Sequence, residues 1–80
     1  MYLQISMLRN KIAHDRRWAA EFFRSAVAAK ESYFVWVELG NEYLAHCLKT
    51  ACDSHLETAA DFELSARQAE RELALLEKSW

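Results

Sequence analysis

The chain has little of what usually interrupts regular structure: it contains no proline and a single glycine among its 80 residues. Tight turns and β-hairpins depend on glycine and proline at defined positions, so a fold built from many such turns is excluded. The residues that are present are mostly good helix formers. The sequence therefore predicts an all-α protein.

Long hydrophobic runs and cysteines are also scarce. No stretch of 18 apolar residues could span a membrane, and the N-terminus lacks the pattern of a secretory signal. The two cysteines, Cys47 and Cys52, are five residues apart, which places them on different sides of a continuous helix and argues against an intrachain disulfide. We expect a cytosolic protein with reduced thiols and no membrane contact.

Apolar side chains, in contrast, are abundant for so small a chain. They make up 52% of the residues, and aromatic side chains 12%. A domain of this size buries only about 60% of the surface that its unfolded chain exposes. Residues 33–37, Y-F-V-W-V, point all the way round a helix, of which an arc of only about 100° faces a core. This excess of apolar surface predicts self-association or a stable protein partner.

The charge is unevenly distributed along the chain. Residues 1–30 hold six Lys or Arg against two Asp or Glu, whereas residues 31–80 hold four against ten. A basic segment could meet an acidic partner or nucleic acid, but these basic residues do not form a dense run. We expect the two parts to attract each other or to form solvated faces, and nucleic acid is not expected as a partner.

The first thirty residues predict a hairpin of two helices. Apolar residues recur at helical spacing between residues 2 and 13. Asp15 can then cap a second helix by accepting a hydrogen bond from a backbone amide in its first turn. Ser32 is a candidate cap, or a slight break, after that helix. The second helix carries two neighbouring apolar stripes: Trp18, Phe22, Ala26 and Ala29 beside Ala19, Phe23 and Val27.

The C-terminal part carries a regular apolar pattern in steps of three and four residues, which is a heptad seam. Ser54 and Glu57 have the spacing of a capping box, so the sequence leaves open whether a helix restarts there or runs on from Asn41. The seam residues are Ala59, Phe62, Ala66, Ala69, Leu73, Leu76 and Trp80.

Trp36, Leu39, Gly40 and Tyr43 have the spacing W-x2-L-G-x2-Y. This signature resembles the first helix of a tetratricopeptide (TPR) repeat, a helix-turn-helix unit of 34 residues. The resemblance implies that Gly40 lies inside a helix, where the missing side chain lets a second helix approach closely. It also implies that residues 33–37 are packed on both sides, by the second helix and by a preceding repeat.

The second helix of that family has small, large and small residues spaced A-x3-F-x2-A. Two sets of residues have this spacing: Cys52, Leu56 and Ala59, and, earlier in the chain, Ala19, Phe23 and Ala26. The chain departs from the family in the first helix of the earlier unit and in lacking the proline expected after the second helix. The resemblance implies a binding scaffold and says nothing of catalysis.

A second resemblance involves Arg9 and His14, which lie in R-N-K-I-A-H. This segment is similar to the R-x4-H motif of HEPN ribonucleases, in which arginine and histidine act on the RNA backbone. Histidine can exchange a proton with a ribose 2′-hydroxyl, and arginine can hold the phosphate. In that family the motif lies late in the chain, whereas eight residues precede Arg9 here. The alternative function is therefore RNA cleavage or RNA binding. The simpler interpretation of the motif is that Arg9 is a surface residue and His14 lies at the end of a helix.

Four side chains that can bind metals lie within ten residues: His46, Cys47, Cys52 and His55. Cysteine and histidine are the usual ligands of tetrahedral zinc, but this spacing matches no common zinc finger. We interpret the cysteines as small hydrophobic residues with histidines at their margin. No metal or other cofactor is expected, because the sequence has no phosphate-binding loop or nucleophile motif either.

Together these patterns predict one domain over residues 1–80, with three to four helices in antiparallel hairpins, as a TPR-like or small helical bundle. A basic helical hairpin is expected over residues 1–30, a TPR-like helix pair over 31–56, and a long heptad-bearing amphipathic helix over 57–80.

The function that these patterns favour is protein binding. We expect an adaptor, chaperone-like or inhibitory module, not an enzyme, that holds a partner's helix against an apolar face. A structural homodimer is a further alternative, because it needs the same apolar seam. The candidate anchors are Phe23, Phe34, Trp36, Tyr43, Leu73 and Leu76.

Overall fold

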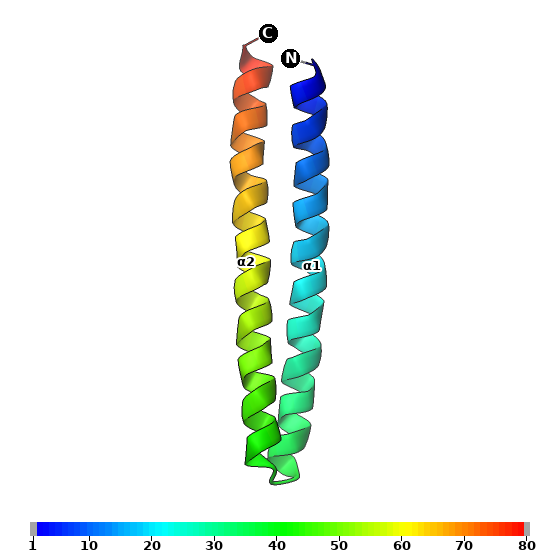
Figure 1. Ribbon diagram of the computed structural model, residues 1–80, viewed down its shortest axis with the longest axis vertical. Helices are drawn as coiled ribbons and strands as arrows, with labels where there is room; N and C mark the ends of the chain where they lie inside the picture. The colour runs from blue at the N-terminus through cyan, green and yellow to red at the C-terminus, as the bar shows by residue number, and fades with distance from the viewer. Residues whose placement is uncertain (1, 80) are drawn as a thin grey trace.

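The computed structural model describes residues 2–79, which form two long helices (Figure 1). Helix α1 spans Tyr2–Glu38 and helix α2 spans Glu42–Lys78. They lie side by side in opposite directions, so the start of α1 and the end of α2 lie together at one end of the hairpin and the turn lies at the other (Figure 1). The Cα atoms extend over 61 × 13 × 12 Å. The predicted all-α class is confirmed, but the predicted three to four helices are wrong: the hairpin has two.

Helix α1 continues through both positions at which a break was expected. Asp15 and Ser32 lie inside it, and the boundary predicted after residue 30 also falls within it. Asp15 does not cap a helix, because its carboxylate instead binds Lys11 Nζ, one turn earlier, at 2.9 Å. With no glycine or proline between residues 2 and 38, nothing in the backbone opposes a continuous helix.

Helix α2 is also continuous, which answers the question that the Ser54 and Glu57 spacing leaves open. Both residues lie inside the helix, and the hydroxyl of Thr58 donates to the carbonyl oxygen of Ser54 at 3.0 Å. The boundary predicted between residues 56 and 57 therefore falls within α2 as well. Neither helix in the described part of the chain is long and apolar enough to cross a membrane.

Three residues, 39–41, connect the helices. The amide of Gly40 donates to Val37 O at 3.1 Å and the amide of Asn41 to Trp36 O at 3.0 Å, the pair of bonds of a Schellman cap. Gly40 has a φ of 77°, which an L side chain rarely adopts. Asn41 then caps α2, because its Oδ1 accepts a hydrogen bond from the amide of Leu44 at 3.0 Å. Gly40 thus lies in the turn, not inside a helix as the TPR resemblance implies.

The helices meet along a seam, defined as the residues at heptad spacing that face the other helix. The spacing predicted for the C-terminal part is confirmed over residues 59–76, whereas Trp80 lies outside the described residues. The seam also extends back along α2 to the turn. On α1 it comprises Ile5, Leu8, Ile12, Asp15, Ala19, Phe22, Ala26, Ala29, Tyr33 and Trp36. On the other side it begins at Asn41, the cap of α2, and continues along α2 through Ala45, Leu48, Cys52, His55, Ala59, Phe62, Ala66, Ala69, Leu73 and Leu76.

The centre of this seam is built from small side chains. Among residues 2–79, the buried apolar ones are all alanines: Ala19, Ala26, Ala45, Ala59, Ala66 and Ala69. Alanines let helix axes approach to about 8 Å, the short end of the usual range. Because each alanine buries little apolar area, the seam contributes less to stability than one built from leucine or isoleucine.

Ion pairs follow one side of the seam. Arg9 pairs with Glu77 at 3.3 Å, and Arg16 pairs with Glu70 and lies 3.9 Å from Glu63. These basic residues of α1 and acidic residues of α2 therefore attract each other, which is one of the two outcomes that the charge distribution leaves open. These pairs are about half exposed, so each contributes at most about 1 kcal/mol.

Candidate functional site

A second apolar stripe runs along α1, one residue on from the seam. Each of its members directly follows a seam residue, so it is turned by about 100° around the helix, away from the α1–α2 contact. We call it the outer stripe; six of its eight residues are apolar. It comprises Ala13, Arg16, Ala20, Phe23, Val27, Lys30, Phe34 and Val37.

The large side chains of the outer stripe are exposed to solvent. The exposed fractions are 56% for Phe23, 42% for Val27, 54% for Phe34 and 49% for Val37. They occur at steps of three, four or seven residues, which is the spacing that lets a helix present one continuous ridge to another helix. This surface therefore has the pattern of a helix contact without a helix against it.

A shallow groove between the two helices borders the outer stripe. It consists of three adjoining hollows, which extend from Arg16 and Glu63 in the middle of the hairpin, here called the upper part of the groove, to Gly40 at the turn. Phe23 and Leu56, which is 42% exposed, line its upper part, and Phe34 lines its middle. An apolar ridge beside a groove is the arrangement that helix-in-groove recognition uses.

On the α2 side of this groove, the residues outside the seam are mostly polar. Apart from Leu56 and Ala60, the α2 residues that line it are charged, polar or part of the seam, such as Lys49, Asp53 and Glu63. A partner helix would therefore meet its apolar contacts on α1 and its polar contacts on α2.

The predicted anchors lie in three different places. Phe23 and Phe34 are brought together on the outer stripe, as described above. Tyr43 is 76% exposed beside the turn, whereas Trp36 is half-buried in the seam. Leu73 and Leu76 also belong to the seam and are half-buried at the other end of the hairpin, where Leu76 borders an open apolar cleft with Leu8 of α1.

Three residues of this surface are missing from the predicted anchors: Val27, Val37 and Leu56. Val27 and Val37 share the step-of-three-and-four spacing with Phe23 and Phe34, which is the signal that could have identified them. Leu56 has no such signal, because its exposure depends on which side of α2 faces α1.

Arg9 and His14 are separated around α1. Five residues correspond to about 140° on a helix, so the two side chains point to different sides. The guanidinium of Arg9 pairs with Glu77. His14 lies 3.4 Å from Asp15 Oδ1 through its Nδ1 and packs against Trp18 edge to face. The hairpin thus does not bring them to one site.

The four potential metal ligands are also not gathered. Cys52 and His55 lie in the seam, whereas Cys47 is exposed, and both cysteines are free. The ring of His55 packs 5.8 Å from the ring of Phe22. Within residues 2–79, no group of three or more His, Cys, Asp or Glu side chains has a geometry that could hold a metal ion.

The buried charged residue of the seam is Asp15, which is 5% exposed. Ser65 across the seam and Lys11 on the same helix bind its carboxylate and lower its pKa below the usual 3.8, with a smaller contribution from His14. Lys11 also donates to the hydroxyl of Ser65, so the three side chains link α1 to α2. None of its three side chains lines the groove or the cleft described above, so we assign the cluster a structural role.

Comparisons with known proteins add no relative: no family model matches the chain, and no curated protein or solved structure is significantly similar to it.

Proposed function

We propose that the chain is a protein–protein interaction module whose outer stripe on α1 packs against a helix of a binding partner. The observation that carries this proposal is the row of half-exposed large side chains, Phe23, Val27, Phe34 and Val37, at the spacing of a helix contact. Exposed apolar rows of this kind mark interaction sites in soluble proteins.

The total surface supports the proposal. The hairpin exposes 6195 Å². A compact monomer of the same mass, 9.3 kDa, exposes about 5,000 Å². The excess exceeds the roughly 800 Å² that one partner contributes to an interface of standard size. A second protein that covers one side of the hairpin would remove this excess exposed surface from solvent.

The thin core supports it as well. Chains shorter than about 80 residues seldom gain more than about 5 kcal/mol from one core, and many are stabilised by disulfides, metals or association. The cysteines here are free. Association through the outer stripe would add apolar burial that the alanine seam does not supply.

A site-specific cross-link tests the proposal. Phe23 is replaced by the photoreactive benzoylphenylalanine in the full chain, and Leu64, which is 55% exposed on α2, is replaced in the control. After irradiation in cells that express the protein, cross-linked peptides are identified by mass spectrometry. We expect position 23 to yield one defined helical segment of a protein chain, at several times the yield from position 64.

A second substitution makes the result specific to the stripe. Val27→Asp, added to the Phe23 probe, should abolish the cross-link, because an aspartate would be buried in the contact without a partner. Equal yields from positions 23 and 64, or a cross-link that survives Val27→Asp, would contradict the proposal.

A further inference from the structure

We propose that the partner is a second copy of this chain, with the two α1 helices packed antiparallel through their outer stripes around a twofold axis near Val27. This inference rests on the proposed function and names the occupant of the same surface. The resulting assembly is a bundle of four helices, two from each hairpin.

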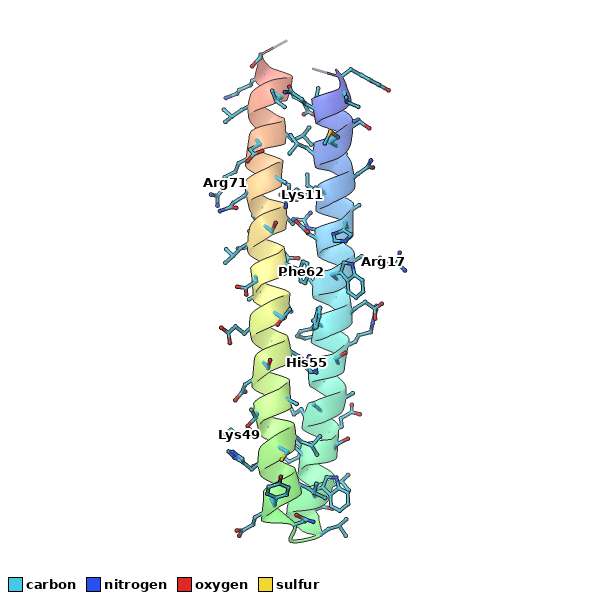
Figure 2. The ribbon with its side chains drawn as sticks, in the orientation of Figure 1. Lys11, Arg17, Lys49, His55, Phe62 and Arg71 are labelled. Carbon is cyan, nitrogen blue, oxygen red and sulfur yellow. The ribbon has the colours of Figure 1, made fainter. Side chains whose placement is uncertain are left out.

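The charged residues beside the outer stripe of one copy are complementary to the same residues of an antiparallel second copy. Arg17, Arg24, Glu31 and Glu38 directly follow stripe residues, and all four side chains are exposed. Figure 2 shows Arg17 pointing away from α2, at the outer border of α1. The basic pair precedes the acidic pair along the helix. An antiparallel copy therefore places basic residues opposite acidic ones, whereas a parallel copy would place like charges together.

The hairpin itself shows how residues in these positions pair. Arg9 and Arg16 directly follow seam residues of α1, and Glu70 and Glu77 directly follow seam residues of α2. Arg9 pairs with Glu77 and Arg16 with Glu70 across the antiparallel seam. In an antiparallel contact, therefore, charged residues that directly follow facing apolar residues form ion pairs with each other. If two outer stripes face each other in this way, Arg24 pairs with the partner's Glu31 and Arg17 with the partner's Glu38. Each pair occurs twice by symmetry.

The apolar residues of the stripe also fit this alignment. With the twofold axis near Val27, the small Ala20 lies opposite the partner's Phe34, and Phe23 lies opposite the long stem of the partner's Lys30. Alternation of large and small side chains across a helix contact allows interdigitation. The polar α2 residues on this side favour α1, not α2, as the surface that the partner's α1 contacts.

The first measurement is the mass of the purified full chain by sedimentation over a hundredfold concentration range, under reducing conditions. We expect a discrete dimer that dissociates on dilution. Phe34→Glu should yield a monomer of unchanged helix content, because the interface would bury an unpaired charge. A chain that stays monomeric throughout, or that forms a dimer unaffected by Phe34→Glu, would overturn the proposal.

A charge exchange then tests the antiparallel alignment. Arg24→Glu and Glu31→Arg should each weaken the dimer by roughly tenfold, because each replaces two ion pairs by like charges. The double variant should restore the dissociation constant to within about threefold. Arg71→Glu is the matched control, since Arg71 is exposed on α2 and points away from α1 (Figure 2). A double variant no tighter than either single variant would overturn the alignment.

The two proposals can fail separately. If the purified chain is a monomer but the probe at position 23 cross-links to a different protein, the proposal that the partner is a second copy is wrong. The proposal that the outer stripe is an interaction surface then still holds. If the probe yields no defined cross-link and the chain is a monomer, both are wrong.

Discussion

Phe22 of α1 stacks on Phe62 of α2, with ring centroids 5.8 Å apart and ring planes inclined by 17°. Both rings lie in the seam, and Figure 2 shows Phe62 directed from α2 toward α1. The seam residues before and after them, Ala19, Ala26, Ala59 and Ala66, are all buried alanines. The stack is therefore the main contact between large side chains in the middle of the hairpin.

We expect Phe62→Ala to lower the free energy of unfolding by about 2 kcal/mol. A fully buried phenylalanine costs about 3–5 kcal/mol when truncated, and this ring is half-buried. Urea denaturation followed by circular dichroism measures the change. Leu64→Ala, on the exposed side of α2, is the control and should change stability by less than about 0.5 kcal/mol. Equal effects at the two positions would show that the stack contributes nothing.

Enlarging a seam alanine should also destabilise the hairpin. Ala66 is fully buried, so Ala66→Leu forces the helices apart and should cost about 1–3 kcal/mol. Ala74→Leu makes the same chemical change at an exposed position of α2 and should be close to neutral. Thermal unfolding of the two variants compares them, and a more stable Ala66→Leu protein would mean that the helices are not closely packed there.

Gly40→Ala should lower stability by about 1–2 kcal/mol through the backbone alone. A Cβ atom at this position would meet no atom within 4 Å, but the residue has a φ of 77°. A left-handed conformation costs an L residue about 1–2 kcal/mol. Asn tolerates this conformation better than Ala, so Gly40→Asn should lower the stability less than Gly40→Ala. Denaturant midpoints rank the three proteins; alanine and asparagine variants of equal stability would indicate that the turn rearranges.

The stability of the hairpin should depend on pH through Asp15. Its pKa is lowered in the folded protein, so the ionised carboxylate stabilises the fold. This contribution is complete above the usual pKa of 3.8 and is lost as the pH falls through the lower, folded value. Asp15→Asn should cost about 1–2 kcal/mol at pH 7, because a charge-assisted hydrogen bond is lost. The difference between the two proteins should shrink below pH 3.8, as unfolding at several pH values would show.

The helical class and the seam of α2 could be predicted from sequence because they depend on local composition and spacing. The number of helices could not, and Asp15 is the main reason. An aspartate before an apolar segment is a common N-cap, yet here it occupies a seam position. Its partners, Lys11 and Ser65, include one residue from the opposite helix, which no local pattern identifies.

The surface on α1 was only partly predictable for a related reason. Seam and outer stripe lie side by side, so the sequence of α1 presents one wide apolar band. Which half of the band is covered depends on how α2 lies against it. Trp36 and Phe34 show the result: both are aromatic and two residues apart, yet Trp36 faces α2 and Phe34 faces solvent.

The short link at residues 39–41 sets the order in which the two helices can meet. Contacts beside it join residues close in sequence, whereas Arg9 and Glu77, at the open end, are 68 residues apart. The entropy lost on closing a loop grows with its length, so docking should begin at the turn and advance toward the chain ends. Opening of the folded protein should follow the reverse order. The helix contacts at the open end separate first, and amide protons near the turn exchange with solvent last.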